Sequence, residues 1–160
     1  MKGELDRAMA DHDQAISLDP KSMAGYYGRG VIFVRKGEFD RAIANFDQLV
    51  ILDPKYAFAY NDRGSAYAAK GEIDRAIADF DQAISLDPSN PATYTSRGLA
   101  YARKGDGTRA RADFNAALAL PQKYSTGKWA HDTARERLAV LADTPATTTP
   151  AVSAPSPCER

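Results

Sequence analysis

Residues 36–69 read KGEFDRAIANFDQLVILDPKYAFAYNDRGSAYAA, and residues 70–103 read KGEIDRAIADFDQAISLDPSNPATYTSRGLAYAR. More than half of the aligned positions in these two stretches are identical. The step from lysine to glycine to an acidic residue also begins at Lys2 and at Lys104, so it recurs every 34 residues. Self-similarity at such a period is typical of repeat proteins, in which one supersecondary unit stacks on the next.

Each period reads as two helices joined by a short break. Tyr60, Gly64 and Tyr67 are spaced i, i+4, i+7, which places them on one helix face. Gly71 then ends this helix, because glycine adopts the left-handed conformation that commonly closes a helix. The next helix is predicted from an apolar stripe with helical spacing, formed by Ile73, Ala76, Ile77, Phe80, Ala83 and Ile84.

The second helix of the period is predicted to end at Asp87-Pro88, since the residue before a proline is disfavoured in helical geometry. Asn90 is a suitable N-cap for the following helix, and Pro91 suits its first position. Gly64 lies inside a helix, where glycine costs about 1 kcal/mol relative to alanine. We expect close helix packing to offset this cost, with Ala76 as the small residue opposite; Gly30 with Ala42 and Gly98 with Ala110 repeat the pattern.

The spacing of these residues resembles the tetratricopeptide repeat. The resemblance is carried by the period of 34 and by the series Tyr60, Gly64, Tyr67, Ala76, Phe80, Ala83 and Pro88. It implies an all-α fold, a right-handed superhelical solenoid of antiparallel helix pairs. Arg29, Arg63 and Arg97 stand where this family more often has leucine.

We divide the chain accordingly. Full repeats are expected at 23–56, 57–90 and 91–122, after a half repeat at 1–22 that supplies only a second helix. Residues 123–142 are expected to form a capping helix, and the Pro/Thr/Ala-rich segment 143–160 is expected to be disordered. In the capping helix Trp129 is predicted to be an anchor, and the inward residues are predicted to be Ala130, Ala134, Leu138 and Leu141.

Composition narrows the function classes. Lys plus Arg and Asp plus Glu both total 21, so the chain is neutral and nucleic acid is not an expected partner. No stretch approaches the roughly 18 apolar residues of a membrane span. The N-terminal residues do not read as a secretory signal, and one cysteine permits no internal disulfide. We expect a cytoplasmic protein; a periplasmic or envelope location stays open if the native chain starts earlier.

No residues with the spacing of a catalytic or metal site are found, so we expect no enzyme activity, no cofactor and no metal. His12 and His131 are far apart in sequence, and Cys158 has no histidine nearby. The repeated aspartates accompany arginines; Arg75 and Asp79 are predicted to form an i, i+4 surface pair. An enzyme remains possible only if this chain is a fragment of a longer one.

The resemblance implies that partners bind in a concave groove lined by the first helix of each repeat. It places in that groove Ala24, Tyr27, Val31, Val34, Phe58, Asn61, Ser65, Ala68, Ala92, Thr95, Leu99 and Ala102, with Arg35 and Arg103 at the rim. The expected function is therefore a scaffold that binds a peptide or protein segment there. Some family members hold a terminal carboxylate with Lys and Asn; here Tyr27, Val31, Asp62, Ala92 and Ser96 stand at those positions, so such a ligand is not expected.

An alternative is self-association. In a solenoid each helix is covered by its neighbours, and the half repeat lacks one of them. Leu5, Met9 and Ile16 would then lack part of their cover and could contact a second copy or an upstream repeat.

Overall fold

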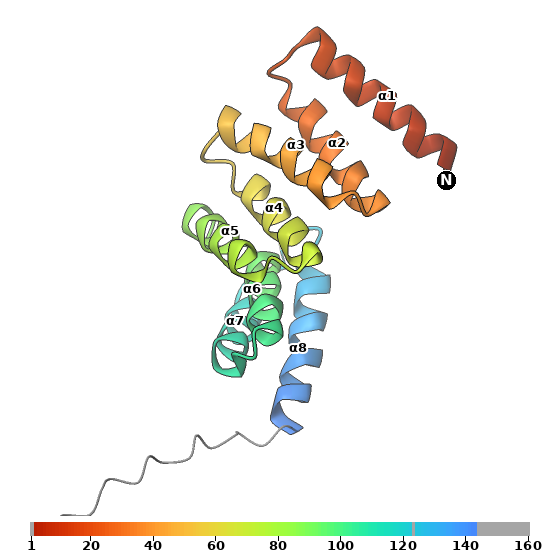
Figure 1. Cartoon of the computed structure of the whole chain (residues 1–160). Coiled ribbons are helices and arrows are strands. Elements are labelled where there is room, and N and C mark those ends of the chain that lie inside the picture. The colour runs from red at the N-terminus through yellow and green to blue at the C-terminus, as the bar shows by residue number, and fades with distance from the viewer. Residues whose placement is uncertain (1, 123, 144–160) are drawn as a thin grey trace, which may run out of the picture.

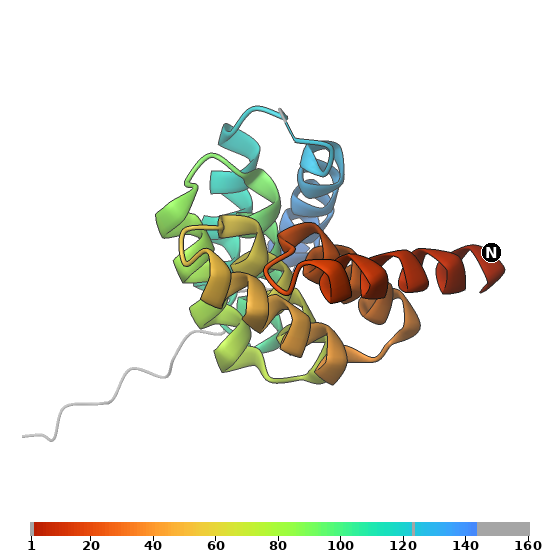
Figure 2. The ribbon, with the colours of Figure 1, turned by 90° about the horizontal axis from the view of Figure 1, so that it is seen from above.

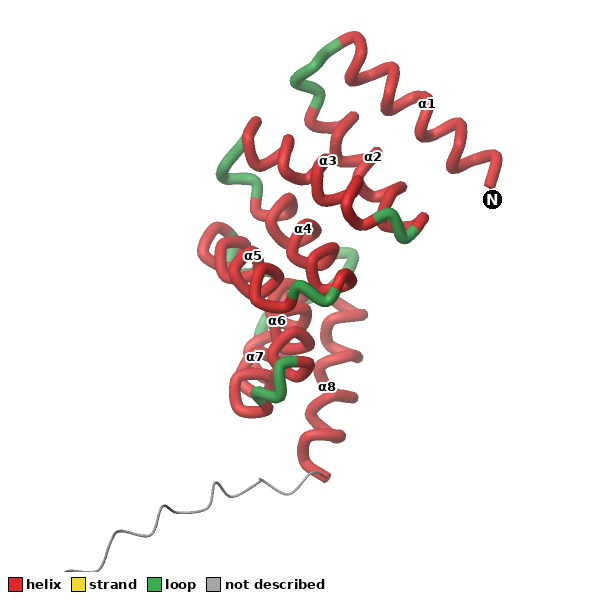
Figure 3. Tube along the Cα trace, viewed as in Figure 1, coloured by secondary structure: helices red, strands yellow, loops and turns green. Residues whose placement is uncertain are grey.

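A computed structural model describes residues 2–122 and 124–143. Within these ranges all regular structure is helical, as Figure 3 shows, and no strand occurs. The eight helices are α1 (Lys2–Leu18), α2 (Met23–Lys36), α3 (Phe39–Leu52), α4 (Ala57–Lys70), α5 (Ile73–Leu86), α6 (Pro91–Arg103), α7 (Gly107–Ala119) and α8 (Gly127–Asp143). The segment 143–160 was predicted to be disordered: Asp143 is the last residue of α8, and the rest of the segment lies outside the described residues.

The helices stack as pairs into a right-handed solenoid (Figures 1 and 2). The pairs α2–α3, α4–α5 and α6–α7 each pack internally, and each pair packs on the next through α3–α4 and α5–α6. At one end α1 packs on α2, as the second helix of a half repeat would. At the other end α8 packs on both α6 and α7. The expected all-α solenoid is thus confirmed.

The helix ends follow the local sequence. Gly37, Gly71 and Gly105 adopt the left-handed conformation, with φ values of 74°, 85° and 82°, as predicted for Gly71. The Asn90 side chain caps α6 by accepting a hydrogen bond from the backbone N–H of Ala92, and Pro91 is the first helical residue. These local signals place the chain reversals before any tertiary contact is considered.

The core of each pair is an aromatic ring set against a glycine. Phe46, Phe80 and Phe114 are fully buried at the same position of successive periods. A Cβ added at Gly64 would lie 2.9 Å from Cε1 of Phe80 and 3.1 Å from the carbonyl oxygen of Ala76. The expected close approach of Ala76 to Gly64 is confirmed, and the Phe80 ring lies nearer still, in the space that the missing side chain leaves.

Arginines join three consecutive helices. Nε and Nη2 of Arg63 on α4 donate to the two carboxylate oxygens of Asp79 on α5, at 2.8 and 2.7 Å. Its Nη1 donates to Asp47 of the preceding α3 at 2.7 Å. Arg97 makes the same three bonds, to Asp113 and to Asp81. At the position where the family more often has leucine, these arginines thus join the two helices of one repeat and also bind the preceding repeat.

The predicted surface pair of Arg75 with Asp79 was wrong. Asp79 is buried and is bound by Arg63 from the neighbouring helix. Arg75 instead donates to Glu72 at 2.5 Å and to the hydroxyl of Tyr67 at 2.5 Å, and its guanidinium lies 4.0 Å from the centre of that ring. Helical spacing alone cannot distinguish these partners, because the competing contact comes from another helix.

The capping helix α8 is held by small residues. Ala130 and Ala134 are fully buried, and Leu138 and Leu141 pack against the core around Phe114, as predicted. Trp129, however, is 48% exposed and is not the anchor that the sequence suggested. The small alanines allow α8 to approach α6 and α7 closely, and this leaves the indole at the edge of the contact.

His131 has a structural position in the same helix. Its ring is buried, with Nδ1 2.9 Å from Nε2 of Gln122 and Nε2 3.0 Å from the carbonyl oxygen of Leu120. These contacts fasten α8 to the segment that leads into it. None of the described helices is long and apolar enough to cross a membrane.

Candidate functional site

A pocket of about 230 Å³ lies between α4 and α6. Four predicted groove residues line it together: Ser65 and Ala68 from α4, and Leu99 and Arg103 from α6. The exposed indole of Trp129 on α8 lines it as well. With Phe80 of α5 also in the lining, the pocket has apolar walls from four helices and one cationic side chain, that of Arg103.

Arg103 positions the cationic side of this pocket. Its Nη1 donates a hydrogen bond of 2.8 Å to the carbonyl oxygen of Ala68 in the last turn of α4. This bond links the first helices of two adjacent repeats, and it reaches a carbonyl oxygen that also accepts the backbone N–H of Gly71 at the end of α4. The guanidinium retains further N–H groups for a ligand.

Two predicted groove residues are not open to a partner. Ala92 and Thr95 on α6 are buried, and the Thr95 hydroxyl donates to the carbonyl oxygen of Ala130 on α8 at 3.1 Å. These two residues were expected to line an open groove, and the structure corrects this: both are buried, and α8 covers Thr95 where it packs on α6. The groove is closed at these two positions of the third repeat, whereas Leu99 and Arg103 of the same helix line the pocket.

The other predicted positions lie along α2, α4 and the end of α6. Val34 and Phe58 are large apolar side chains with 37% and 38% of their surface exposed. Ala24, Arg35 and Ala102 are exposed as well, while Val31, Tyr27 and Asn61 are half-buried. None of these residues lines the pocket between α4 and α6.

Aromatic rings connect the first repeat to the segment before α8. Tyr27 lies 6.5 Å from Tyr56, Tyr56 lies 5.9 Å from Phe58, and Phe58 lies 6.0 Å from Tyr124, measured between ring centroids. The Tyr124 hydroxyl donates to Asp87 at 2.7 Å. Sequence reasoning missed Tyr56 and Tyr124, since both lie outside the helices whose periodicity was used.

Asp62 is a desolvated carboxyl beside these rings. Burial raises its pKa above the ordinary value, and this outweighs the hydrogen bonds from Asn61 and Tyr27 that favour the ionised form. Burial and then the charge of Asp62 raise the pKa of Tyr27 to about 12. Asn61 donates to Asp62 at 3.0 Å, and its own Oδ1 is buried with no hydrogen-bond partner among the described residues.

The residues proposed for self-association are partly covered. Leu5, Met9 and Ile16 are all half-buried; Met9 packs against the core, and Ile16 lies against Gly25 of α2. The more exposed apolar side chain of α1 is Leu18, at 78%, which the sequence argument did not single out.

The residues that the structure describes contain no cluster of metal-ligating side chains. No three His, Cys, Asp or Glu side chains gather there as a metal site would require. The His12 ring fits the space left by Gly28, where an added Cβ would meet it at 2.1 Å. Cys158 lies outside the described residues.

Comparisons with solved structures found the same architecture. A crystal structure of MamA superposes with a TM-score of 0.70 at 23% identity, covering 88% of each chain. The Yersinia enterocolitica type III secretion translocator chaperone SycD, in an alternative dimer, gives 0.71 at 18% identity over 76% of this chain and 92% of that one. At these identities the likeness shows the fold alone.

A third solved structure is the second TPR domain of human RPAP3 in complex with an HSP70 peptide. It gives a TM-score of 0.65 at 26% identity, covering 74% of this chain and 93% of that domain. A search of curated protein sequences found no match to the chain. A sequence model of the TPR repeat matches residues 30–71 and 64–105. The chain therefore contains tetratricopeptide repeats at these residues, and the helix-pair solenoid continues on both sides of them.

Proposed function

We propose that this chain is a binding scaffold that holds a segment of another protein against α4 and α6. The observation that carries the proposal is the pocket in which Ser65, Ala68, Leu99 and Arg103 meet the exposed indole of Trp129. A half-exposed tryptophan at the mouth of an apolar pocket is the kind of anchor that dominates protein interfaces.

The chemistry of the pocket defines the preferred ligand segment. An aliphatic side chain would pack between Leu99 and Trp129. Arg103 would donate hydrogen bonds to a backbone carbonyl or a carboxylate beside that side chain. Val34 and Phe58 provide further exposed apolar surface on α2 and α4, along which the segment would continue.

A structural neighbour supports this mode of binding. The RPAP3 domain was solved in complex with an HSP70 peptide, so a similar helix-pair array accepts a peptide ligand. Asp62 stands here where carboxylate-binding relatives have asparagine, so we propose that an internal segment is preferred over a free C-terminus.

The test uses affinity capture with two matched variants. Leu99→Glu places a charge in the pocket, and Ile51→Glu makes the same change at an exposed apolar residue of α3. We expect the wild type and Ile51→Glu to retain a partner that Leu99→Glu loses, with all three proteins equally helical by circular dichroism. Retention of the same partner by Leu99→Glu would refute the proposal.

Trp129 offers a direct readout of the same event, because it is the only tryptophan in the chain. A bound segment would cover the indole and shift its fluorescence emission to shorter wavelength. Ligand that binds without changing this emission would place the site elsewhere.

Self-association through α1 is the second candidate, because α1 ends the stack and Leu18 is exposed there. It requires a mass that rises with concentration in sedimentation experiments and that falls to the monomer value after Leu5→Ser, Met9→Ser and Ile16→Ser.

We further propose that full repeats begin at residues 23, 57 and 91. We also propose that the protein is cytoplasmic and that it does not bind nucleic acid.

A further inference from the structure

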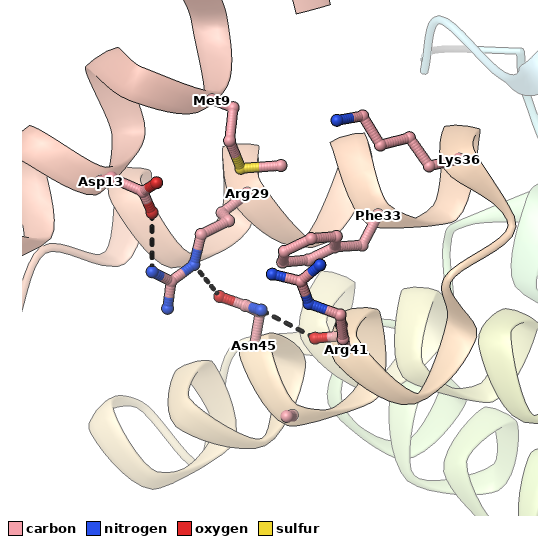
Figure 4. A pocket seen from close by; sticks show the side chains of 8 residues that line it. Met9, Asp13, Arg29, Phe33, Lys36, Arg41 and Asn45 are labelled. Carbon is pink, nitrogen blue, oxygen red and sulfur yellow. Dashed lines mark hydrogen bonds and ion pairs between the residues drawn. The ribbon is translucent and has the colours of Figure 1, made fainter. Parts of the chain in front are cut away.

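A second pocket, of about 360 Å³, lies outside the groove between α1, α2 and α3 (Figure 4). Figure 4 shows Met9 and Phe33 beside it, together with the cationic side chains of Arg29, Lys36 and Arg41. Its volume falls within the range of small-ligand sites in proteins. The corresponding positions of the next two repeats allow an internal comparison.

Within the part of the chain that the structure describes, one N–H donor group of Arg29 is unpaired, whereas the same group is paired in Arg63 and Arg97, its counterparts in the next two repeats. Its Nε donates to Oδ1 of Asn45 at 2.7 Å and its Nη1 donates to Asp13 at 2.9 Å. Its Nη2 has no partner among the residues that the structure describes. In the next repeat Nη2 of Arg63 donates to Asp79, and Arg97 does the same with Asp113.

The difference originates at Asn45. Asp79 and Asp113, one and two periods later, accept two hydrogen bonds through two carboxylate oxygens. Asn45 has a single oxygen, and its Nδ2 donates to the carbonyl oxygen of Arg41 at 2.7 Å. Beside Arg29 there is therefore one hydrogen-bond acceptor fewer, and one negative charge fewer, than beside Arg63 or Arg97.

Phe33 removes a second acceptor. The corresponding Tyr67 accepts a hydrogen bond of 2.5 Å from Arg75 through its hydroxyl. Arg41 stacks on the Phe33 ring, 4.1 Å from its centre, and donates to Glu38 at 2.6 Å, as Arg75 does with Tyr67 and Glu72, but Phe33 has no hydroxyl to accept a further bond.

Lys36 is also less fully paired than its counterpart. Its Nζ lies 3.4 Å from Asp6, whereas Lys70 lies 2.6 Å from Asp40 and 2.5 Å from Glu72. Arg29, Lys36 and Arg41 thus border one pocket, which Asp13 also lines, and among the described residues each has fewer oxygen partners than its counterpart one period later, Arg63, Lys70 or Arg75.

We propose that this pocket binds a carboxylate carried on a short apolar stem, from a free dicarboxylate or from a glutamate side chain of another polypeptide. The carboxylate accepts a hydrogen bond from Nη2 of Arg29, in place of the oxygen that Asn45 lacks. Figure 4 draws the Lys36 ammonium apart from this donor, so Lys36 contributes positive charge to the pocket and not a second hydrogen bond to the same carboxylate. The stem packs between Met9 and Phe33. This site is separate from the groove and does not depend on the proposed function.

The experiment titrates the full chain with three probes: glutarate, a blocked Gly-Gly-Glu-Gly-Gly peptide and its glutamine analogue. Binding is followed by the Nε–Hε signal of Arg29 in nitrogen-15 NMR spectra. We expect saturable shifts with a dissociation constant on the order of 1 mM for the acidic probes and none for the glutamine peptide. The tighter of the two acidic probes identifies the source of the carboxylate.

Two variants complete the test. Asn45→Asp restores the residue present in the other repeats and should weaken binding about tenfold or more, because a like charge then occupies the site. Asn115→Asp makes the same change at an exposed position of α7 and should leave binding unchanged. Equal binding by Asn45→Asp, equal binding of the glutamine peptide, or no shift with either acidic probe would each overturn the proposal.

Discussion

The guanidinium of Arg63 and the carboxylate of Asp79 face each other in a bidentate pair, with donor–acceptor distances of 2.8 and 2.7 Å. Both side chains are largely shielded from solvent, at 17% and 10% exposure. A planar pair of this kind fixes orientation as well as distance, so it sets how α4 packs on α5. Its third bond, to Asp47, extends the same control to the preceding repeat.

Asp79→Asn should destabilise the fold, because one of the two charged hydrogen bonds is lost inside the helix contact. We expect a loss of about 1.5–3 kcal/mol in the free energy of unfolding, measured by urea denaturation. Asp74→Asn is the control: its carboxylate pairs with Lys104 but is 81% exposed, so the loss should be below about 1 kcal/mol. Equal losses would show that the buried pair has no special role.

Gly64→Ala should be destabilising although alanine is the better helix former. The added Cβ would lie 2.9 Å from the buried Phe80 ring, and overpacking of this kind costs about 1–3 kcal/mol. Gly3→Ala, in α1, meets nothing within 4 Å and should be neutral or stabilising by up to about 1 kcal/mol. Thermal unfolding of both variants checks the prediction, and a stabilised Gly64→Ala protein would contradict it.

Asp62 should make stability fall as the pH rises above its ordinary pKa of 3.8. Its pKa is raised in the folded state, so the folded chain binds a proton that the unfolded chain has already released. The resulting stabilisation is complete below pH 3.8 and is lost as the pH rises through the folded-state pKa. In Asp62→Asn this loss should disappear, as seen in unfolding midpoints measured across the acidic range. An unchanged pH profile would assign the effect to other carboxyl groups.

Ala134→Leu should loosen α8, since a fully buried alanine leaves no space for a larger side chain. We expect a loss of about 1–3 kcal/mol and, as α8 moves away from α6, a red shift in the emission of Trp129. Ala139→Leu changes an exposed position of the same helix and should alter neither quantity. Unchanged emission in Ala134→Leu would mean that α8 tolerates the substitution without moving.

The local sequence was sufficient for the helices, their ends and their number in each repeat. Gly71 and Asn90 work through the conformation of their own backbone or through neighbours a few residues away, which a single sequence displays directly. The resemblance to the tetratricopeptide repeat implied the groove positions Ser65 and Ala68 on α4, which line the pocket beside α6. What spacing could not show is that α8 covers Thr95, since that contact joins residues 35 positions apart.

The sequence by itself thus determined the repeat, the helix pairs and the face on which each helix is apolar, because these depend on propensity and periodicity along the chain. The tertiary structure alone decided which partner each charged side chain has. Asp79 could reach Arg75 along its own helix, yet it binds Arg63, since a buried carboxylate is stabilised more by a shielded bidentate donor than by a solvated neighbour. It also decided that Trp129 lies at the pocket while the small Ala130 and Ala134 make the contact, because close helix approach selects for side-chain volume and not for hydrophobicity alone.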